Sequence, residues 1–184
     1  PANKNSNNDL VTIGWTGTFS SKLYLDRLSS IFQQLALKVD FKLRIIGNFD
    51  YELPGVNLEV IQWSLDNEVR DMQKIDSGVY PLHMDEWVMG KSGLKAIQYL
   101  AFGIPVVATD IGTTPLIIAN NINGYLAKTD EDWLDSLEKL VLNPELRQNM
   151  GAEARKNALE HYSTKVISSE YRMILQAVTG DSND

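Results

Sequence analysis

Residues 90–109, which read GKSGLKAIQYLAFGIPVVAT, constrain the fold of this chain more than any other segment. Apolar residues first recur there at helical spacing, and Ser92 stands where an N-cap is expected. Gly103 ends this helix in a left-handed cap, and Pro105 prevents its continuation. The wholly apolar residues 104–108 then predict a strand that is buried on both faces. A helix that leads directly into such a strand is half of a parallel α/β unit.

The same helix has a polar face on which Lys91, Lys95 and Gln98 follow one another at spacings of four and three residues. The free N–H groups at a helix N-terminus and the helix dipole favour an anion. Two lysines and an amide beside that N-terminus therefore suit a phosphate or diphosphate group. Lysines four residues apart are also ordinary on a solvent-exposed helix face. The spacing by itself leaves the phosphate site and the solvated face as alternatives.

A glycine turn near the N-terminus offers a second position for a phosphate. Residues 10–15 predict a strand, residues 14–18 a tight turn, and residues 22–37 a helix that Ser20 or Ser21 caps. Strand, glycine turn and helix in this order are typical of the first unit of a nucleotide-binding fold. A turn glycine that is needed only for its backbone conformation would give the same pattern.

The remaining apolar periodicity predicts that strands and helices alternate along the chain. We expect further strands at residues 41–46, 56–63, 75–82 and 125–127, and further helices at residues 65–74, 133–142, 145–161 and from about 164 onward. Ser64 and Asp130 are the expected N-caps of two of these helices, and Pro144 is expected in the first turn of another. The predicted fold class is α/β, a Rossmann-like parallel sheet of about six strands flanked by helices.

The run GKSGLKAIQYLAFGIPVVATDIGTTPLI resembles the donor-site segment of glycosyltransferase family 4, the retaining enzymes of GT-B fold. A subgroup of that family has the pattern G-K-x-x-x-K-x-x-x-Y-M-A-x-G-x-P-V-V. This chain is similar to it at Gly90, Lys91, Lys95, Tyr99, Ala101, Gly103 and Pro105. The similarity to the family extends from Thr12 to Tyr162, nearly the whole chain. It implies the C-terminal domain of such an enzyme, which binds the nucleotide-sugar donor and forms one half of a GT-B glycosyltransferase.

The resemblance also implies roles for individual residues. Lys91 and Lys95 would stabilise the departing diphosphate and are the expected catalytic residues. Trp63 would stack on the nucleobase, or else belong to the core. The full set of expected donor-binding residues is Gly17, Thr18, Ser20, Ser21, Trp63, Asp85, Glu86, Ser92, Gly93, Leu94 and Gln98.

The chain departs from the family at several of these positions. The family's two glutamates fall on Gly90 and Gln98, and its arginine after the first-turn glycine corresponds to Thr18. Hydroxyl groups in the first turn would then replace part of the usual diphosphate clamp. Asp85 or Glu86 would replace the missing glutamate at the sugar hydroxyls, unless residues 83–89 are only a solvated loop.

The composition of the chain bears on other classes of protein. With 24 acidic and 17 basic residues and a net charge of −7, the chain is unsuited to broad binding of nucleic acid. It has no cysteine, which excludes disulfides, a thiol nucleophile and a thiolate metal site. No apolar stretch approaches the roughly 18–20 residues of a membrane span. We expect neither a metal nor a cofactor besides the sugar-nucleotide substrate, because amides and lysines are the expected partners of the diphosphate.

Residues 1–9 are expected to be a linker remnant, residues 10–180 the donor-binding domain and residues 181–184 a disordered tail. The resemblance implies an acceptor-binding domain earlier in the same parent chain. It also implies a cytoplasmic enzyme of cell-surface polysaccharide or glycan biosynthesis, held at the inner membrane through that missing half. The present chain alone should transfer no sugar, because a GT-B enzyme reacts in a cleft between two halves.

Two other functions are alternatives to a transferase. One is a nucleotide-binding regulatory module without transferase activity, which the departures at the glutamate and arginine positions would fit. The other is an epimerase of the same architecture, but the sequence offers no constellation of carboxylates and histidines for its proton chemistry.

Overall fold

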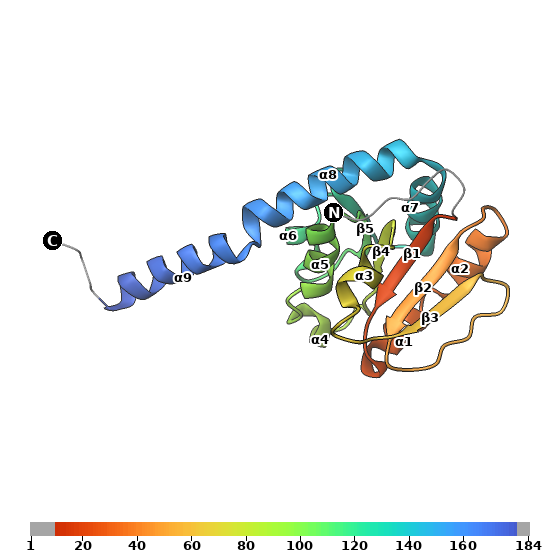
Figure 1. The fold of residues 1–184 in the computed structure, drawn as a ribbon, viewed down its shortest axis with the longest axis horizontal. Coiled ribbons are helices and arrows are strands. Elements are labelled where there is room, and N and C mark those ends of the chain that lie inside the picture. Colours follow the sequence, from red (N-terminus) through yellow and green to blue (C-terminus); the bar gives the residue numbers. More distant parts are fainter. Residues whose placement is uncertain (1–9, 180–184) are drawn as a thin grey trace.

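The computed structural model describes residues 10–179, within which six strands form a single parallel sheet (Figure 1). The order across the sheet is β3-β2-β1-β4-β5-β6. The order reverses between β1 and β4, as in the Rossmann folds that bind nucleotides. The predicted fold class is therefore confirmed. The strands are β1 (Thr12–Thr16), β2 (Lys42–Gly47), β3 (Leu58–Gln62), β4 (Ser77–Tyr80), β5 (Val106–Thr109) and β6 (Gly124–Ala127).

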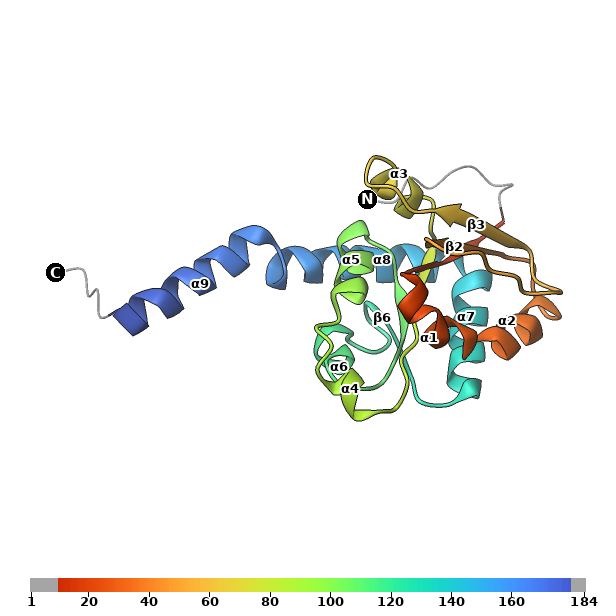
Figure 2. The same cartoon turned by 90° about the horizontal axis from the view of Figure 1, so that it is seen from below.

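Helices cover both faces of this sheet (Figure 2). α1, α2 and α7 pack against one face, α3 and α5 pack against the other, and α8 packs on α5. The helices are α1 (Lys22–Asp26), α2 (Ser29–Ala36), α3 (Glu68–Met72), α4 (Glu86–Met89), α5 (Leu94–Phe102), α6 (Thr114–Ile117), α7 (Asp130–Leu142), α8 (Pro144–His161) and α9 (Thr164–Thr179), with a 3₁₀ turn at Phe19–Ser21.

Strand β1 lies between two apolar layers. Its residues Ile13 and Trp15 pack in the layer of α2 and α7, where Phe32 and Trp133 are fully buried. Tyr99 of α5 is fully buried in the opposite layer. Successive residues of a strand face opposite sides of the sheet, so a strand that is covered on both faces needs apolar or small residues throughout. This requirement explains the near-continuous apolar runs of the sequence.

Two glycines at the centre of the sheet make room for side chains of the α5 layer. Gly14 and Gly78 pair in register on β1 and β4. A Cβ atom on Gly78 would lie 2.6 Å from the ring of Tyr99, and a Cβ atom on Gly14 would overlap Ile75. The Tyr99 hydroxyl donates to the Gly14 carbonyl oxygen at 3.1 Å, and burial raises the pKa of Tyr99. Tyr99 thereby fixes α5 against β1, next to the point where the strand order reverses.

The single helix predicted over residues 22–37 is wrong, because the chain forms two helices there, α1 and α2. At the break, the Leu28 N–H donates to the Leu25 carbonyl oxygen three residues earlier, at 2.9 Å. Such a tightened turn stacks side chains that are three residues apart. Leu25 and Leu28 are both fully buried, so the tight turn lets both side chains enter the core.

Two of the predicted helix caps are also wrong. The Ser64 hydroxyl accepts from the Asn67 side-chain amide at 2.9 Å within a turn, and α3 begins only after that turn. At α7 the cap is Thr129 rather than Asp130. The Thr129 hydroxyl accepts from the Asp132 N–H at 3.1 Å, and the Asp132 carboxylate accepts from the Thr129 N–H at 2.9 Å. The reciprocal pair satisfies donors that the first turn leaves free.

Most other element boundaries shift by one to three residues from the predictions, as at β3, where residues 58–62 replace the predicted 56–63. Pro144 stands in the first turn of α8 as predicted, and Asn143 caps that helix by accepting from the Leu146 N–H at 2.9 Å. The predicted linker at residues 1–9 and the predicted tail at 181–184 lie outside the described residues.

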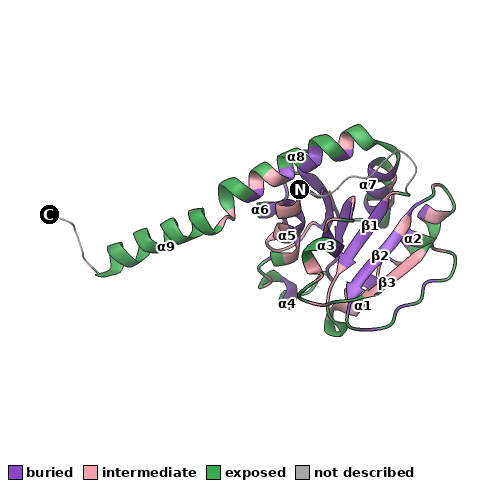
Figure 3. Cartoon of the chain, in the orientation of Figure 1, coloured by how far each residue is buried: buried purple, intermediate pink, exposed green. Residues whose placement is uncertain are grey.

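Helix α9 extends away from the rest of the chain (Figures 1 and 3). None of its residues is buried, and it carries an uncovered set of large apolar side chains, namely Ile167, Tyr171, Met173, Ile174, Leu175 and Val178. Across residues 10–179, α9 and every other helix lack the length and apolar character that crossing a membrane requires.

Candidate functional site

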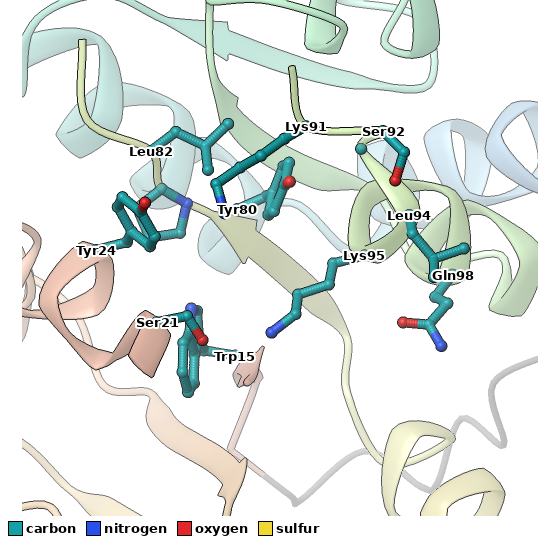
Figure 4. A pocket seen from close by; sticks show the side chains of 12 residues that line it. Trp15, Ser21, Tyr24, Tyr80, Leu82, Lys91, Ser92, Leu94, Lys95 and Gln98 are labelled. Atoms are coloured by element: carbon teal, nitrogen blue, oxygen red, sulfur yellow. The ribbon is translucent and has the colours of Figure 1, made fainter. Parts of the chain in front are cut away.

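A cavity of about 350 Å³ opens where the strand order reverses, between the ends of β1 and β4 and the start of α5 (Figure 4). Open parallel sheets bind ligands at this position. Segments far apart in the sequence meet there. The lining residues are Trp15, Ser21, Tyr24, Tyr80, Pro81, Leu82, Lys91, Ser92, Gly93, Leu94, Lys95 and Gln98.

Helix α5 begins with Gly93 rather than with a serine cap. Gly93 is the N-cap residue and has φ = 70°, in the left-handed region that favours glycine. A Cβ atom at this position would also overlap the end of the Ile117 side chain, which would have to move. The prediction that Ser92 caps the helix is wrong. No side chain caps α5, and the positive end of its dipole lies at the cavity wall formed by residues 92–94.

Lys95 reaches from α5 to the end of β1 (Figure 4). Its Nζ atom donates to the Thr16 carbonyl oxygen at 2.7 Å and lies 5.1 Å from the centre of the Trp15 ring. Burial, and secondarily the charge of Lys91, lower the pKa of Lys95 to about 8. The ammonium group is therefore held beside the first glycine turn by a carbonyl group and an aromatic face.

Lys91 lies at another part of the same cavity. Its Nζ atom is 5.0 Å from the centre of the Tyr24 ring, and His83 packs against that ring with 5.1 Å between ring centroids. The Lys91 carbonyl oxygen accepts from the Thr113 hydroxyl at 2.8 Å, which fixes the backbone just before α5. The structure thus brings the two predicted lysines to one cavity and gives each an aromatic partner.

The hydroxyl groups of the first turn form hydrogen bonds within the turn itself. The Ser21 hydroxyl donates to the Thr18 carbonyl oxygen at 3.0 Å and accepts from the Thr18 N–H at 3.1 Å. The Thr18 and Ser20 hydroxyl oxygens lie 2.9 Å apart. The Gly17 N–H donates to the Ile46 carbonyl oxygen at 3.0 Å. Of these turn residues, Ser21 lines the cavity.

The remaining predicted donor-binding residues lie outside the cavity lining. The segment expected to be a loop contains the short helix α4, and the Asp85 carboxylate caps it by accepting from the Val88 N–H at 2.9 Å. Glu86 is exposed in the first turn of α4. Trp63 is 48% exposed at the end of β3, so it belongs to the sheet edge rather than to the core.

Sequence reasoning missed the aromatic walls of the cavity. Trp15 and Tyr80 are nearly buried at the ends of β1 and β4, and Tyr24 comes from α1. The apolar alternation of β1 signals that Trp15 belongs to the sheet, but not that it faces a cation. Nothing in the local sequence connects Tyr24 with Lys91, because their contact joins segments 67 residues apart.

Residues 10–179 contain no cluster of side chains that could serve together as metal ligands. No group of three or more histidine, aspartate or glutamate side chains is clustered there in a way that would hold an ion. The sequence Asp130-Glu131-Asp132 has the Asp-x-Asp spacing of a metal-binding motif. It forms the start of α7, however, where the Asp132 carboxylate completes the helix cap described above.

Curated relatives resemble the chain over part of their length. The N-acetyl-alpha-D-glucosaminyl L-malate synthase of Bacillus anthracis is 26% identical over 160 residues, which cover 83% of this chain and 42% of that relative. The poly(ribitol-phosphate) alpha-N-acetylglucosaminyltransferase of Staphylococcus aureus is 38% identical over 82 residues, 43% of this chain and 17% of the relative. The chain therefore spans less than half the length of these relatives.

Solved structures share the fold. A variant of S. aureus TarM in complex with Fondaparinux, alpha-GlcNAc-glycerol and UDP aligns with a TM-score of 0.67 at 23% identity, covering 91% of this chain and 36% of that one. The model of the protein family described as "Glycosyl transferases group 1" matches residues 1–157 of this chain. The match includes both the glycine turn after β1 and the lysine-bearing start of α5. On this match, the chain belongs to the group 1 glycosyltransferases.

Proposed function

We propose that the cavity binds the diphosphate of a sugar nucleotide and that the chain is the donor-binding domain of a retaining glycosyltransferase of family 4. One observation carries the proposal. Lys91, Lys95 and the uncapped start of α5 converge on one cavity at the switch point of a parallel sheet. Each of these groups favours an anion, and a diphosphate is long enough to contact all three.

The chemistry of sugar transfer requires such groups. The bond between the anomeric carbon and the diphosphate oxygen breaks, and its electron pair leaves with the diphosphate. The oxygen of an acceptor hydroxyl bonds to the anomeric carbon, and the proton of that hydroxyl leaves with the diphosphate. Negative charge grows on the leaving group as the sugar becomes oxocarbenium-like. Fixed cations and helix amides at that position stabilise the transition state more than the ground state. We assign this role to Lys95 and Lys91 and expect no metal to take part.

The names of the relatives support a wider proposal. The S. aureus relative is named for transfer to poly(ribitol-phosphate). We propose by analogy that the parent enzyme acts in cell-surface polysaccharide or glycan synthesis in the cytoplasm. In this proposal an N-terminal domain of the same parent chain supplies acceptor contacts and any attachment to the inner membrane. We also propose that the chain belongs to the subgroup of family 4 with the motif G-K-x-x-x-K-x-x-x-Y, which Gly90, Lys91, Lys95 and Tyr99 match.

Nucleoside diphosphates should bind this chain without a metal. A ligand that binds only the native state raises the melting temperature, so UDP, GDP and ADP can be screened by thermal shift and confirmed by calorimetric titration. We expect one of them to bind equally well with magnesium and with EDTA. A strict requirement for magnesium would contradict the metal-free assignment. Failure of all three to bind would contradict the proposed function.

Affinity for a sugar nucleotide should fall as the pH rises. In the free protein the pKa of Lys95 is lowered to about 8, and the diphosphate diester keeps its charge through this range. Binding needs the protonated lysine, so raising the pH from about 7 to about 9 should weaken affinity roughly tenfold. Calorimetry at several pH values would measure this change. The variant Lys95→Met should show weaker binding with a flat pH profile, and an equally steep profile in that variant would assign the effect to another group.

The chain by itself should not transfer sugar to an acceptor. Incubating purified protein with a radiolabelled sugar nucleotide and candidate acceptors should yield no glycoside, because the acceptor contacts belong to the proposed N-terminal domain. Glycoside formation by this chain alone would contradict the assignment of the acceptor contacts to the N-terminal domain. Binding in the present chain together with inactivity of the complete parent enzyme would instead favour a regulatory nucleotide-binding module.

A further inference from the structure

The ring of Trp15 contacts both the glycine turn after β1 and the ammonium group of Lys95. Trp15 is nearly buried close to the end of β1, and its ring lines the cavity (Figure 4). The Lys95 Nζ atom lies 5.1 Å from the ring centre. A Cβ atom on Gly17 would lie 2.2 Å from the Cη2 atom of the same ring. One side chain therefore lies against two of the groups that we expect to bind the diphosphate.

This close contact explains why residue 17 is a glycine. Gly17 does not have a positive φ, so its backbone conformation does not require glycine. The absence of a side chain instead lets the turn backbone approach the Trp15 ring. A Cβ atom would also lie 2.7 Å from the Ser21 hydroxyl oxygen. The position of the turn thus depends on the position of the ring.

An aromatic cluster holds the Trp15 ring in place. Phe49, which follows β2, meets it edge-on, with 5.8 Å between the ring centroids and 70° between the ring planes. Phe19 and Tyr51 pack against Phe49 in the same edge-on manner, with centroid distances of 6.5 and 6.4 Å. Aromatic pairs prefer this geometry. The Trp15 ring is therefore a fixed support for the groups that lie against it.

The side chain of Lys95 crosses the end of β1 to reach this ring. Trp15 packs in the layer of α2 and α7, whereas α5, which carries Lys95, packs on the other face of the sheet. One ammonium N–H donates to the Thr16 carbonyl oxygen at 2.7 Å. An ammonium group has three donors, so the carbonyl and the ring fix its position while N–H groups remain for a ligand. Within residues 10–179, no carboxylate pairs with Lys95.

We propose that Trp15 is a positioning residue for diphosphate binding and that it acts through the Lys95 ammonium group. The inference rests on the proposed function, since it assumes a diphosphate in this cavity. Fixing a lysine side chain costs conformational entropy, and a contact that fixes it beforehand removes this cost from binding. Attraction of a partly desolvated ammonium group to an aromatic face favours one position about tenfold. Without the ring that position is less populated, and the apparent affinity falls by the same factor.

A double-mutant cycle tests whether the ring acts through Lys95. The probes are UDP, GDP and ADP, and the cycle is measured by calorimetric titration with whichever binds the wild-type chain. Trp15→Leu should weaken binding about tenfold in the wild-type background and at most about threefold in the Lys95→Met background, where only the support of the turn is lost. The matched control is Phe41→Leu. It removes a buried ring of the same apolar layer that does not line the cavity, and it should leave the affinity unchanged.

A fluorinated ring tests the same point with little change in ring shape, and it decides the question if Trp15→Leu does not fold. 4-Fluorotryptophan at position 15 withdraws electron density from the ring face. Its fluorine is bonded to Cε3, away from the Cη2 atom that faces Gly17. We expect about twofold weaker binding of the diphosphate in the wild-type background and no change in Lys95→Met. The same substitution at Trp133, which is fully buried outside the cavity lining, should have no effect.

The outcomes separate the two proposals. Equal losses from Trp15→Leu in both backgrounds, or an affinity that fluorination of Trp15 leaves unchanged, would overturn this inference, because the ring would then act by packing alone. Either result leaves the proposed function standing, since the wild-type chain binds the probe. Failure of UDP, GDP and ADP to bind the wild-type chain would overturn the proposed function and this inference with it.

Discussion

Replacing Lys95 with alanine should weaken binding of a nucleoside diphosphate about tenfold to hundredfold and leave binding of the nucleoside nearly unchanged. A charge-assisted contact to phosphate in a partly buried site contributes roughly 1.5–3 kcal/mol. The nucleoside has no phosphate and does not use this contact. Titrations with UDP and uridine, or with GDP and guanosine, would give both affinities for the wild-type chain and the variant.

Two controls make the result specific to the phosphate contact. Lys95 also donates to the Thr16 carbonyl oxygen, so denaturant unfolding must show that the variant is folded at the titration temperature. Lys74→Ala removes an exposed lysine far from the cavity lining and should change neither affinity. Small and equal effects of Lys95→Ala on diphosphate and nucleoside would assign Lys95 to the solvated face, and the phosphate site would then have to lie at the glycine turn alone.

Replacing Tyr99 with alanine should destabilise the chain by roughly 3–5 kcal/mol, the usual cost of removing a buried aromatic ring. The ring is fully buried and fills the space that Gly78 leaves open, and its hydroxyl bonds to Gly14 at 3.1 Å. Tyr99→Phe keeps the ring and removes only this bond, so it should destabilise by about 1–2 kcal/mol. Chemical denaturation followed by far-UV circular dichroism would measure both changes.

Comparing the stabilities of the two variants separates the contribution of the packed ring from that of its hydrogen bond. If Tyr99→Phe proved as damaging as Tyr99→Ala, the hydrogen bond rather than the packed ring would hold α5 to β1. If both variants were nearly as stable as the wild type, the close approach of Tyr99 to Gly78 would not matter for stability.

The sequence was sufficient to predict the sheet because its strands are marked locally. The apolar run at 104–108, which follows Gly103 and includes Pro105, predicts a buried strand without knowledge of its neighbours. The glycine turn after residue 13 and the polar start of α5 likewise mark helix–strand units. The order of the strands was not predicted, because β4 pairs with β1 rather than with its sequence neighbour β3, and no local pattern marks that change.

Helix ends were less predictable because distant contacts decide them. Ser92 has the side chain of an N-cap, yet the N-cap is Gly93, whose backbone has φ = 70° and which packs against the Ile117 side chain. The break between α1 and α2 depends on how Leu25 and Leu28 enter the core. Local propensity contains neither piece of information.

The site could be predicted only in part, because its lysines lie close together in the sequence whereas the residues that hold them do not. The spacing of Lys91, Lys95 and Gln98 predicted one helix face, and all three do line the cavity, but Lys91 lies before the start of α5 rather than on it. The partners that hold the lysines come from β1 and α1, and the bond between Lys95 and Thr16 spans 79 residues. Such pairings appear only when the fold is assembled.

The central position of β1 has a consequence for how the chain acquires its binding site. Among the described residues, β1 is the first strand in the sequence. Its partner β2 follows soon after it, whereas the first residue of its other partner, β4, lies 64 positions after Ile13. A growing chain can thus complete β3-β2-β1 while one edge of β1 is still unpaired and open to wrong partners. The cavity forms only when the second half of the sheet closes that edge. A nucleotide that binds this cavity, as we propose, would therefore stabilise only chains in which both halves have joined.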